Sequence, residues 1–385
     1  IELAAARVRT LSPEAILRRL KGEDGSVSLK VLRGRSRDRQ ARQATIRGAI
    51  QWSWDLIEPW EKAALAQCSV FKGGFDLDAA EAVLELSGWE DAPDWDELIE
   101  ELVDQSLLRR VEPAELIGEV RFEMLHTIQA FAREKLRSCA TPGIGSDRLH
   151  DESLARHARW YAQLGEPDRL SELHGIHSRA ILPRYQLELE NLAAVVRRPT
   201  HVISSQDAVR AGLAAMELLD RQGPQRKAIE LGEILLDRDD LDEEVRSSVA
   251  YRQGRTLATV GRIAESCALL EDVLFDSESR GDRRLQTEVL IALAAAYRRT
   301  GDGAASQSAA RDALKHARDD RQLDLEGRVL SELGTLFIRK GKYDEARQHL
   351  TLAADRLRAT NWARQLGMTL LNLGQTCREQ GALVE

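Results

Sequence analysis

The residues of this chain that could do chemistry on their own are few and scattered. The four cysteines include no CxxC pair, and each falls in or near a helical pattern: Cys68, Cys139, Cys267 and Cys377. A free cysteine in such a position behaves as a small apolar residue. The spacing therefore predicts neither a disulfide framework nor a zinc site, which fits a reducing cytoplasm.

The histidines show no metal-binding pattern either. His150 and His157 are two turns apart on an expected helix, and His174 and His177 lie in a polar loop. A zinc site needs three or four converging ligands, so we expect no metal and interpret these side chains as solvated surface. No Ser-His-Asp or Cys-His arrangement stands out, although dispersed residues can converge in a fold.

The chain also lacks a phosphate-binding loop. The pattern GxxxxGK[ST] occurs nowhere in the 385 residues, so no Gly-rich turn of backbone N–H groups is expected to cradle phosphates. We therefore predict that this chain is not an enzyme by itself and carries no cofactor of its own.

Composition describes the elements that must carry any site. The chain is 43% hydrophobic and 31% charged with nine prolines, which predicts a mainly α protein of two or three domains. Its net charge of -8 gives no general attraction to nucleic acid or anionic membranes. It has no signal peptide and no run of 18 apolar residues, so we expect a cytoplasmic protein without membrane contact. It opens without Met inside a helical pattern, and we expect it to be part of a longer protein.

The second half contains a repeat of 40 residues. Gly261, Gly301, Gly341 and Gly381 share this spacing, and a small residue lies seven positions before each: Gly254, Ala294, Gly334 and Gly374. A small residue lets a second helix approach closely, and the following glycine ends the first helix in a left-handed conformation. The pattern predicts helix pairs that stack into an α-solenoid over 206–385, with a degenerate unit at 216–237 and a truncated last unit. It resembles the tetratricopeptide repeat, most closely at 325–359.

The first half reads as helices followed by a hairpin. Ile46, Ile50, Trp54 and Ile57 form one helical stripe, and Pro59 opens a second helix. Asp76 or Asp78 can cap a third helix, a fourth covers 95–105, two strands lie within 106–125, and a last helix follows. This order predicts a winged helix-turn-helix domain at 46–140 and a helical connector at 141–205. Residues 1–45 are expected to be a helical remnant of a preceding module plus an Arg-rich linker.

Three tryptophans, Trp52, Trp54 and Trp60, fall within nine positions of this domain. Buried tryptophans each remove about 150–250 Å² from water, and neither metal ligands nor an acid-base pair accompanies them. We interpret all three as core rather than as a ligand site.

The stretches "AIQWSWDLI" and "SVFKGGFDLDAAEAV", with "RFEMLHTIQAFAREKL", carry a further resemblance. Residues 1 to about 198 are similar to the region after the nucleotide-binding core in STAND-class bacterial signalling ATPases, which are related to NB-ARC switches. This resemblance implies an upstream ATPase that binds ATP or ADP in the full-length protein, a winged helix that relays nucleotide state, and repeats that bind a protein partner. It also implies a weak nucleotide contact at His126, one residue away from the family's Met-His-Asp motif; the alternative is a helix-start residue with a local hydrogen bond.

Charge bears on whether the winged helix binds DNA. From Asp76 to Asp104 there are twelve acidic residues and no Lys or Arg, and this span includes the expected recognition helix. Because DNA binding depends on cations that neutralise phosphates, we predict that the domain binds protein rather than DNA. The Arg-rich segment at 33–47 reads as a solvated linker. A DNA-binding transcriptional regulator is the alternative function, and an enzyme acting through this chain is a third.

Arginine recurs on one face of the predicted repeats. At 100° per residue, the first, fourth and fifth positions after each small residue turn away from the second helix, and they hold Arg255, Arg298, Arg299, Arg339 and Arg378. The resemblance places this face in the groove of the solenoid. A guanidinium suits carboxylate or phosphate, so we predict a basic groove for an acidic segment of another protein or of this one. The alternative is that these side chains are solvated or paired with neighbours such as Glu379.

Overall fold

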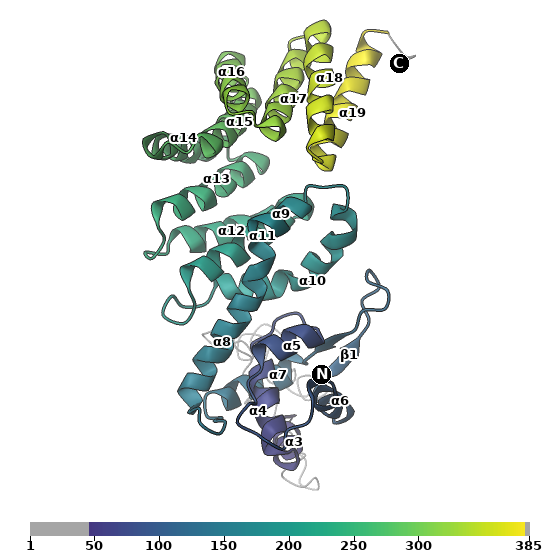
Figure 1. The fold of residues 1–385 in the computed structure, drawn as a ribbon, viewed down its shortest axis with the longest axis vertical. Coiled ribbons are helices and arrows are strands. Elements are labelled where there is room, and N and C mark those ends of the chain that lie inside the picture. Colours follow the sequence, from purple (N-terminus) through teal and green to yellow (C-terminus); the bar gives the residue numbers. More distant parts are fainter. Residues whose placement is uncertain (1–45, 382–385) are drawn as a thin grey trace, which may run out of the picture. The chain divides into compact units, whose positions relative to one another are not determined.

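The computed structural model describes residues 46–381, and the predicted remnant and most of the Arg-rich linker lie outside the described residues. The chain divides into two compact units, Ile1–Tyr161 with His201–Ser204 and Ala162–Thr200 with Ser205–Glu385. The division falls within the predicted connector. The described part is mainly helical, with one two-stranded sheet among its residues, as the sequence predicts (Figure 1).

The first unit has the element order of a winged helix-turn-helix domain. Its elements are α3 (Ile46–Leu56), α4 (Pro59–Cys68), α5 (Leu77–Val83), α6 (Trp95–Asp104), β1 (Arg109–Val111), β2 (Arg121–Glu123), α7 (His126–Leu136) and α8 (Ser146–Ala162). The strands pair antiparallel with Arg110 opposite Phe122, and Phe75 forms an isolated bridge to Phe122 on the other edge.

Local signals in the sequence begin these helices. Pro59 occupies the first turn of α4, and the backbone N–H of Glu58 donates to the Glu61 carboxylate at 2.6 Å. The Asp76 carboxylate caps α5 by accepting from the backbone N–H of Ala79 at 2.9 Å. Caps of this kind satisfy the backbone donors that a first turn leaves free.

The tryptophans divide between core and surface. Trp54 is buried and meets Phe131 of α7 edge to face, with 5.7 Å between the ring centres. Trp60 is partly buried against Trp89, but Trp52 is 54% exposed, so the prediction that all three form the core is wrong for Trp52. Trp52 lies on the opposite side of α3 from the stripe that holds Ile50 and Trp54.

The second unit is an array of helix pairs. Its elements are η2 (Gln163–Gly165), α9 (Pro167–Glu172), α10 (Ser178–Val196), α11 (Ser205–Gln222), α12 (Gln225–Leu236), α13 (Glu243–Thr259), α14 (Ile263–Arg280), α15 (Arg283–Thr300), α16 (Gly303–Asp319), α17 (Leu323–Arg339), α18 (Tyr343–Ala359) and α19 (Ala363–Glu379). From α10 onward each helix packs on the next, and α11, α13, α15, α17 and α19 also contact one another in that order. We call these five the first helices and the surface they share the inner face.

The 40-residue pattern produces these pairs as predicted. Gly261, Gly301, Gly341 and Gly381 all have φ between 69° and 89° just after a first helix ends. This left-handed conformation is one that glycine adopts without penalty.

The two helices of a pair approach closely at two facing residues, one on each helix, that lie sixteen positions apart in the sequence and are matched in size. A Cβ built on Gly334 would lie 2.5 Å from Leu350 Cγ, and one on Gly254 would lie 2.7 Å from Leu270 Cγ. The middle pair has Ala294 instead of glycine, and there the facing residue is Ala310 instead of leucine. The space between the two helices is thus filled either by glycine facing leucine or by alanine facing alanine, so a larger residue on one helix goes with a smaller one on the other.

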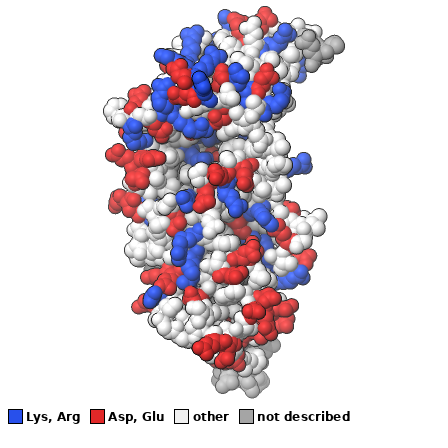
Figure 2. All heavy atoms as spheres, in the orientation of Figure 1, with Lys and Arg blue, Asp and Glu red and all other residues white. Residues whose placement is uncertain are grey.

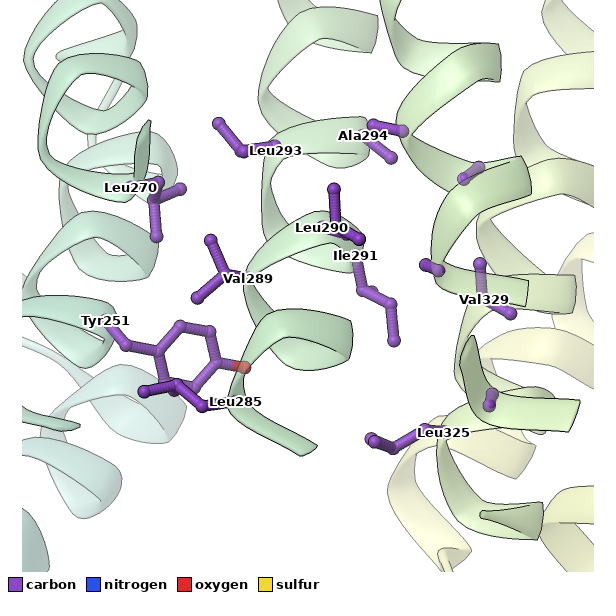
Figure 3. Packing of buried hydrophobic residues seen from close by; sticks show 14 of the residues in the cluster. Tyr251, Leu270, Leu285, Val289, Leu290, Ile291, Leu293, Ala294, Leu325 and Val329 are labelled. Atoms are coloured by element: carbon purple, nitrogen blue, oxygen red, sulfur yellow. The ribbon is translucent and has the colours of Figure 1, made fainter. Parts of the chain in front are cut away.

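The core of the repeats is continuous along the array. In Figure 3, α15 directs Val289 and Leu293 toward Tyr251 and Leu270 on one side, and Ile291 toward Leu325 and Val329 on the other. One helix therefore buries side chains against both neighbouring units, which is why such pairs are stable only when stacked.

Candidate ligand-binding cavity on the inner face of the repeats

A cavity of about 380 Å³ lies on the inner face of the second unit. Every first helix contributes to its wall, together with residues 174 and 362. Its charged and aromatic lining residues are His174, Glu217, Asp220, Tyr251, Arg252, Arg255, Glu288, Arg299, Arg328, Glu332, Trp362 and Arg364.

One side of the cavity is formed where two distant segments of the unit meet. The rings of His174 and Trp362 stack with 4.3 Å between their centres and 20° between their planes. The backbone N–H of Ala363 donates to the His174 carbonyl at 3.0 Å, and that of Ile176 donates to the Asn361 side chain at 3.4 Å. We call these contacts between residues 174–176 and 361–363 the clasp. It joins the start of the helix array to its last described pair.

A ladder of rings and guanidinium groups extends from the clasp along the wall. The guanidinium of Arg328 lies 5.0 Å from the centre of the Trp362 ring and donates to the Tyr251 hydroxyl at 3.3 Å. On the Tyr251 ring, Arg255 lies 5.6 Å from the centre. Cation–π contacts of this kind hold aromatic and cationic side chains in fixed orientations.

His174 is held as a neutral ring. Arg221 donates to its Nδ1 at 2.8 Å, and its Nε2 lies 3.6 Å from Glu217, so the geometry assigns the proton to Nε2. Burial first, and then the charges of Arg221, Arg252 and Arg328, lower the pKa of His174 to about 4.

Most acidic side chains of the wall are paired with arginine. Glu217 accepts from Arg221 at 2.9 Å and from Arg252 at 2.5 Å, and although burial opposes it, the surrounding cations hold the Glu217 pKa well below its usual range. Glu288 pairs with Arg328 at 3.5 Å, and Glu332 pairs with Arg298 at 3.0 Å.

Asp220 is the acidic side chain of the wall that has no ion pair of this kind. It accepts from the Thr256 hydroxyl at 2.7 Å, and burial raises its pKa, while Arg255 acts in the opposite direction. It therefore offsets part of the positive charge of Arg255 without a hydrogen bond to it.

Three arginines of the wall, Arg255, Arg299 and Arg364, donate no hydrogen bond to any residue that the structure describes. Partial burial and then Arg298 lower the pKa of Arg299, and partial burial and then Arg221 and Arg255 lower that of Arg364. The pKa of Arg255 is raised instead, by Tyr251 and then by Glu217, Asp220 and Glu288, against the effect of burial. Guanidinium groups carry five donors and stay charged in proteins. The cavity thus presents unused donors on three arginines, and two of them, Arg299 and Arg364, are repelled by neighbouring arginines.

The arginines singled out by the repeat pattern take different places. Arg255 and Arg299 line the cavity. Arg298 pairs with Glu332, and Arg339 donates to the Arg298 carbonyl at 2.8 Å. Arg378 lies 3.8 Å from Glu379 and is well exposed. Binding of a partner by these five side chains remains a prediction.

His126 is the first residue of α7 and is exposed, and the structure shows no hydrogen bond from its ring to a described residue. Its contact with nucleotide also remains a prediction. His157 differs from the expected solvated surface, since it is completely buried and packs against Phe71 and Tyr161. Its neighbours on α8, Ser153 and Tyr161, are buried as well, which a polar helix pattern did not reveal.

Sequence reasoning missed His174, Trp362 and Arg364. Residues 174 and 362 are 188 positions apart, and no local pattern joins them. One signal was present at Trp362, because the 40-residue repeat places Asp242, Asp282 and Gln322 at the corresponding helix starts. The two aspartates cap their helices and Gln322 does not, but Trp362 is the large aromatic residue among the four.

The winged helix carries its negative charge on the surface of α6. Asp96, Glu97, Glu100, Glu101 and Asp104 are all exposed, while Leu98, Ile99 and Leu102 face the core. Figure 2 shows Asp and Glu gathered in patches on this part of the visible face. An approaching phosphate backbone would meet repulsion along this helix.

Residues 46–381 show neither a metal site nor a membrane-spanning helix. No group of three or more His, Cys, Asp or Glu side chains there could hold a metal ion. None of the described helices is long and apolar enough to cross a membrane.

Comparison with known proteins supports a winged helix-turn-helix domain in the first unit. Residues 58–137 match the sequence family described as the winged helix-turn-helix domain. Proteins of Mycobacterium tuberculosis and Mycobacterium bovis, provisionally named HTH-type transcriptional regulators, are 33% identical over 195 residues, which is 50% of this chain and 20% of each relative. An uncharacterized protein of Mycobacterium tuberculosis is 35% identical over 138 residues, covering 35% of this chain and 33% of that one. The chain thus spans a fifth to a third of the relatives it matches.

Two solved structures show a more distant likeness. A STAND protein with a tetratricopeptide repeat sensor from Pyrococcus horikoshii is 14% identical with a TM-score of 0.44, covering 98% of this chain and 56% of that one. BtubC from P. vanneervenii is 17% identical with a TM-score of 0.43, covering 52% of this chain and 85% of that one. At these values the likeness says nothing about function.

Proposed function

We propose that this chain is a non-catalytic regulatory and interaction part of a STAND-type signal-transduction protein. The repeats bind a negatively charged partner on their inner face, and the winged helix relays the state of an ATPase elsewhere in the full-length protein. The resemblance of residues 1 to about 198 to such proteins supports the second part of this proposal.

One observation carries the binding role. Arg255, Arg299 and Arg364 project unused donors into one cavity, in a chain whose net charge is -8. Arg255 is half-buried and Arg299 and Arg364 are exposed, so an anion that enters the cavity can reach the donors of all three. An acidic segment or another anion is the chemistry that fits.

The second candidate function is a DNA-binding transcriptional regulator. The winged helix-turn-helix match and the provisional names of the mycobacterial relatives favour it. The five exposed carboxylates of α6 oppose it, because the helix that would enter the major groove has no Lys or Arg. The wing residues Arg109 and Arg110 are exposed, but they lie near Glu123 and Glu112 at 2.5 and 2.8 Å.

Fluorescence anisotropy on the whole chain tests these functions together. A labelled peptide rich in Asp and Glu should bind more tightly than a peptide rich in Lys, and added salt should weaken it. Changing Arg298, Arg299, Arg339 and Arg378 to Ala should weaken acidic binding by about tenfold or more, since one charge-assisted contact contributes about 1.5–3 kcal/mol. The matched control is Arg311→Ala on α16, an exposed arginine outside the inner face.

Binding of a labelled DNA duplex, measured in the same way, tests the second candidate function. Salt-sensitive duplex binding that Arg109→Ala and Arg110→Ala abolish would favour the transcriptional regulator. Equal binding of the acidic and basic peptides would contradict the proposed function of the repeats.

A further inference from the structure

We infer that the cavity on the inner face is a binding site for a compact molecule carrying phosphate or carboxylate groups, and that the clasp closes it. This inference rests on the proposed binding role of the inner face and narrows its occupant from an acidic partner to a small anion.

The first support is the charge left over after internal pairing. The wall holds five arginines (residues 252, 255, 299, 328 and 364) and four carboxylates (residues 217, 220, 288 and 332), a balance of +1. Two of those carboxylates, Glu217 and Glu332, also pair with arginines outside the lining, namely Arg221 and Arg298. The net positive charge that faces the cavity is therefore greater than the +1 obtained from the lining residues alone.

The second support is the donor geometry. Arg255, Arg299 and Arg364 come from α13, α15 and α19, so their guanidinium groups approach one cavity from three helices. Each can give two parallel N–H bonds to one carboxylate or phosphate. An anion between them would accept from these donors and would offset the repulsion from Arg221 and Arg255 that, after partial burial, lowers the pKa of Arg364.

The third support is enclosure. The wall runs from α11 through α13, α15 and α17 to α19, and the stacking of Trp362 on His174 joins its two ends. An extended acidic peptide needs an open groove along the helices, whereas this circuit surrounds a volume of about 380 Å³. Small-molecule sites have about 300–1,000 Å³, so the volume suits a compact ligand.

A chain of side-chain contacts connects the clasp to the arginines of the cavity. Trp362 has His174 on one face and Arg328 at 5.0 Å, and Arg328 continues through Tyr251 to Arg255. An anion that draws Arg255 inward acts on the clasp through these three contacts, and Arg364 lies two residues after Trp362 in the chain. Opening of the clasp would provide the entrance, and ligand binding would favour the closed arrangement.

Isothermal titration of the 385-residue chain with pyrophosphate, citrate and inorganic phosphate tests the inference. We expect binding at low salt that raises the melting temperature, with pyrophosphate or citrate tighter than phosphate because they can reach more than one guanidinium. Arg299→Ala and Arg364→Ala should each weaken binding by about 10- to 100-fold, and Arg311→Ala should leave it unchanged.

A second variant tests the clasp. Trp362→Ser introduces a residue that can cap the start of α19 and removes the stacking on His174. It should speed dissociation of the bound anion in a stopped-flow displacement experiment, while far-ultraviolet circular dichroism stays the same.

Two results would overturn the inference. One is an absence of binding by all three anions at millimolar concentration in folded protein. The other is anion binding that neither Arg299→Ala nor Arg364→Ala weakens. If the acidic peptide still bound through Arg298, Arg339 and Arg378 in either case, the proposed function would survive and only the small anion would be excluded. Loss of both the anions and the acidic peptide would sink the two proposals together.

Discussion

The match between glycine and leucine in the repeats gives a quantitative prediction. Gly334→Ala puts a Cβ 2.5 Å from Cγ of Leu350, which is completely buried and cannot swing aside. Overpacking of this kind costs about 1–3 kcal/mol, against a gain of about 1 kcal/mol in helix propensity. We expect a net loss of up to about 2 kcal/mol in the pairing of α17 with α18.

Two matched variants separate the clash from the helix propensity. Gly374 occupies the same repeat position, but a Cβ there meets no described atom within 4 Å. Gly374→Ala should therefore stabilise α19 by up to about 1 kcal/mol. Leu350→Ala alone should cost about 2–5 kcal/mol because it leaves a cavity.

The double variant Gly334→Ala/Leu350→Ala reproduces the arrangement at Ala294 and Ala310. With the clash absent, it should cost no more than Leu350→Ala alone, which corresponds to a favourable coupling of about 2 kcal/mol. Hydrogen exchange of the α17 and α18 amides, read peptide by peptide, is the appropriate assay because a repeat array opens locally. Additive effects within about 0.5 kcal/mol, or stabilisation by Gly334→Ala, would show that the sizes of residues 334 and 350 are not matched.

Two further predictions concern single side chains. His174 has a pKa lowered to about 4, so its contribution to stability is complete above pH 6.5 and is lost as the pH falls toward 4, by about 3 kcal/mol. Melting of the repeats should be less pH-dependent in His174→Gln over that range, and identical curves would show that another group titrates. The charged groups that face His174 are Glu217, Arg221, Arg252 and Arg328. Burial raises the pKa of the Cys68 thiol, which is 1% exposed, so a maleimide should label it only after unfolding; rapid labelling of native protein would contradict its burial.

The sequence was sufficient for the fold because the fold depends on local signals. The glycines spaced by 40 residues fix where α13, α15, α17 and α19 end, and Pro59 and Asp76 mark helix starts in the winged helix. Trp52 was misplaced because three tryptophans were read as one group, whereas the stripe of α3 that contains Trp54 does not include it.

The cavity could be predicted only in part. Arg255 and Arg299 follow from helical periodicity within a repeat, since position within a helix decides which face a side chain occupies. Arg364 and the stacking of His174 on Trp362 depend on how the array curves until residues far apart meet. That curvature accumulates from small rotations between pairs, which no single repeat records.

Trp362 shows that a departure from a repeat can mark a site. At the corresponding positions Asp242 and Asp282 accept the backbone N–H groups of Val245 and Leu285, whereas Gln322 and Trp362 accept none, and of these two the tryptophan stacks on another ring. Losing such a cap costs about 1 kcal/mol, and the stacking on His174 is the interaction gained in exchange. Trp362→Ser should therefore keep the first turn of α19 protected while the amide of Ile176, which bonds to Asn361, exchanges faster. If the first turn of α19 frayed and Ile176 stayed protected, the tryptophan would be a helix-start residue and the clasp would not depend on it.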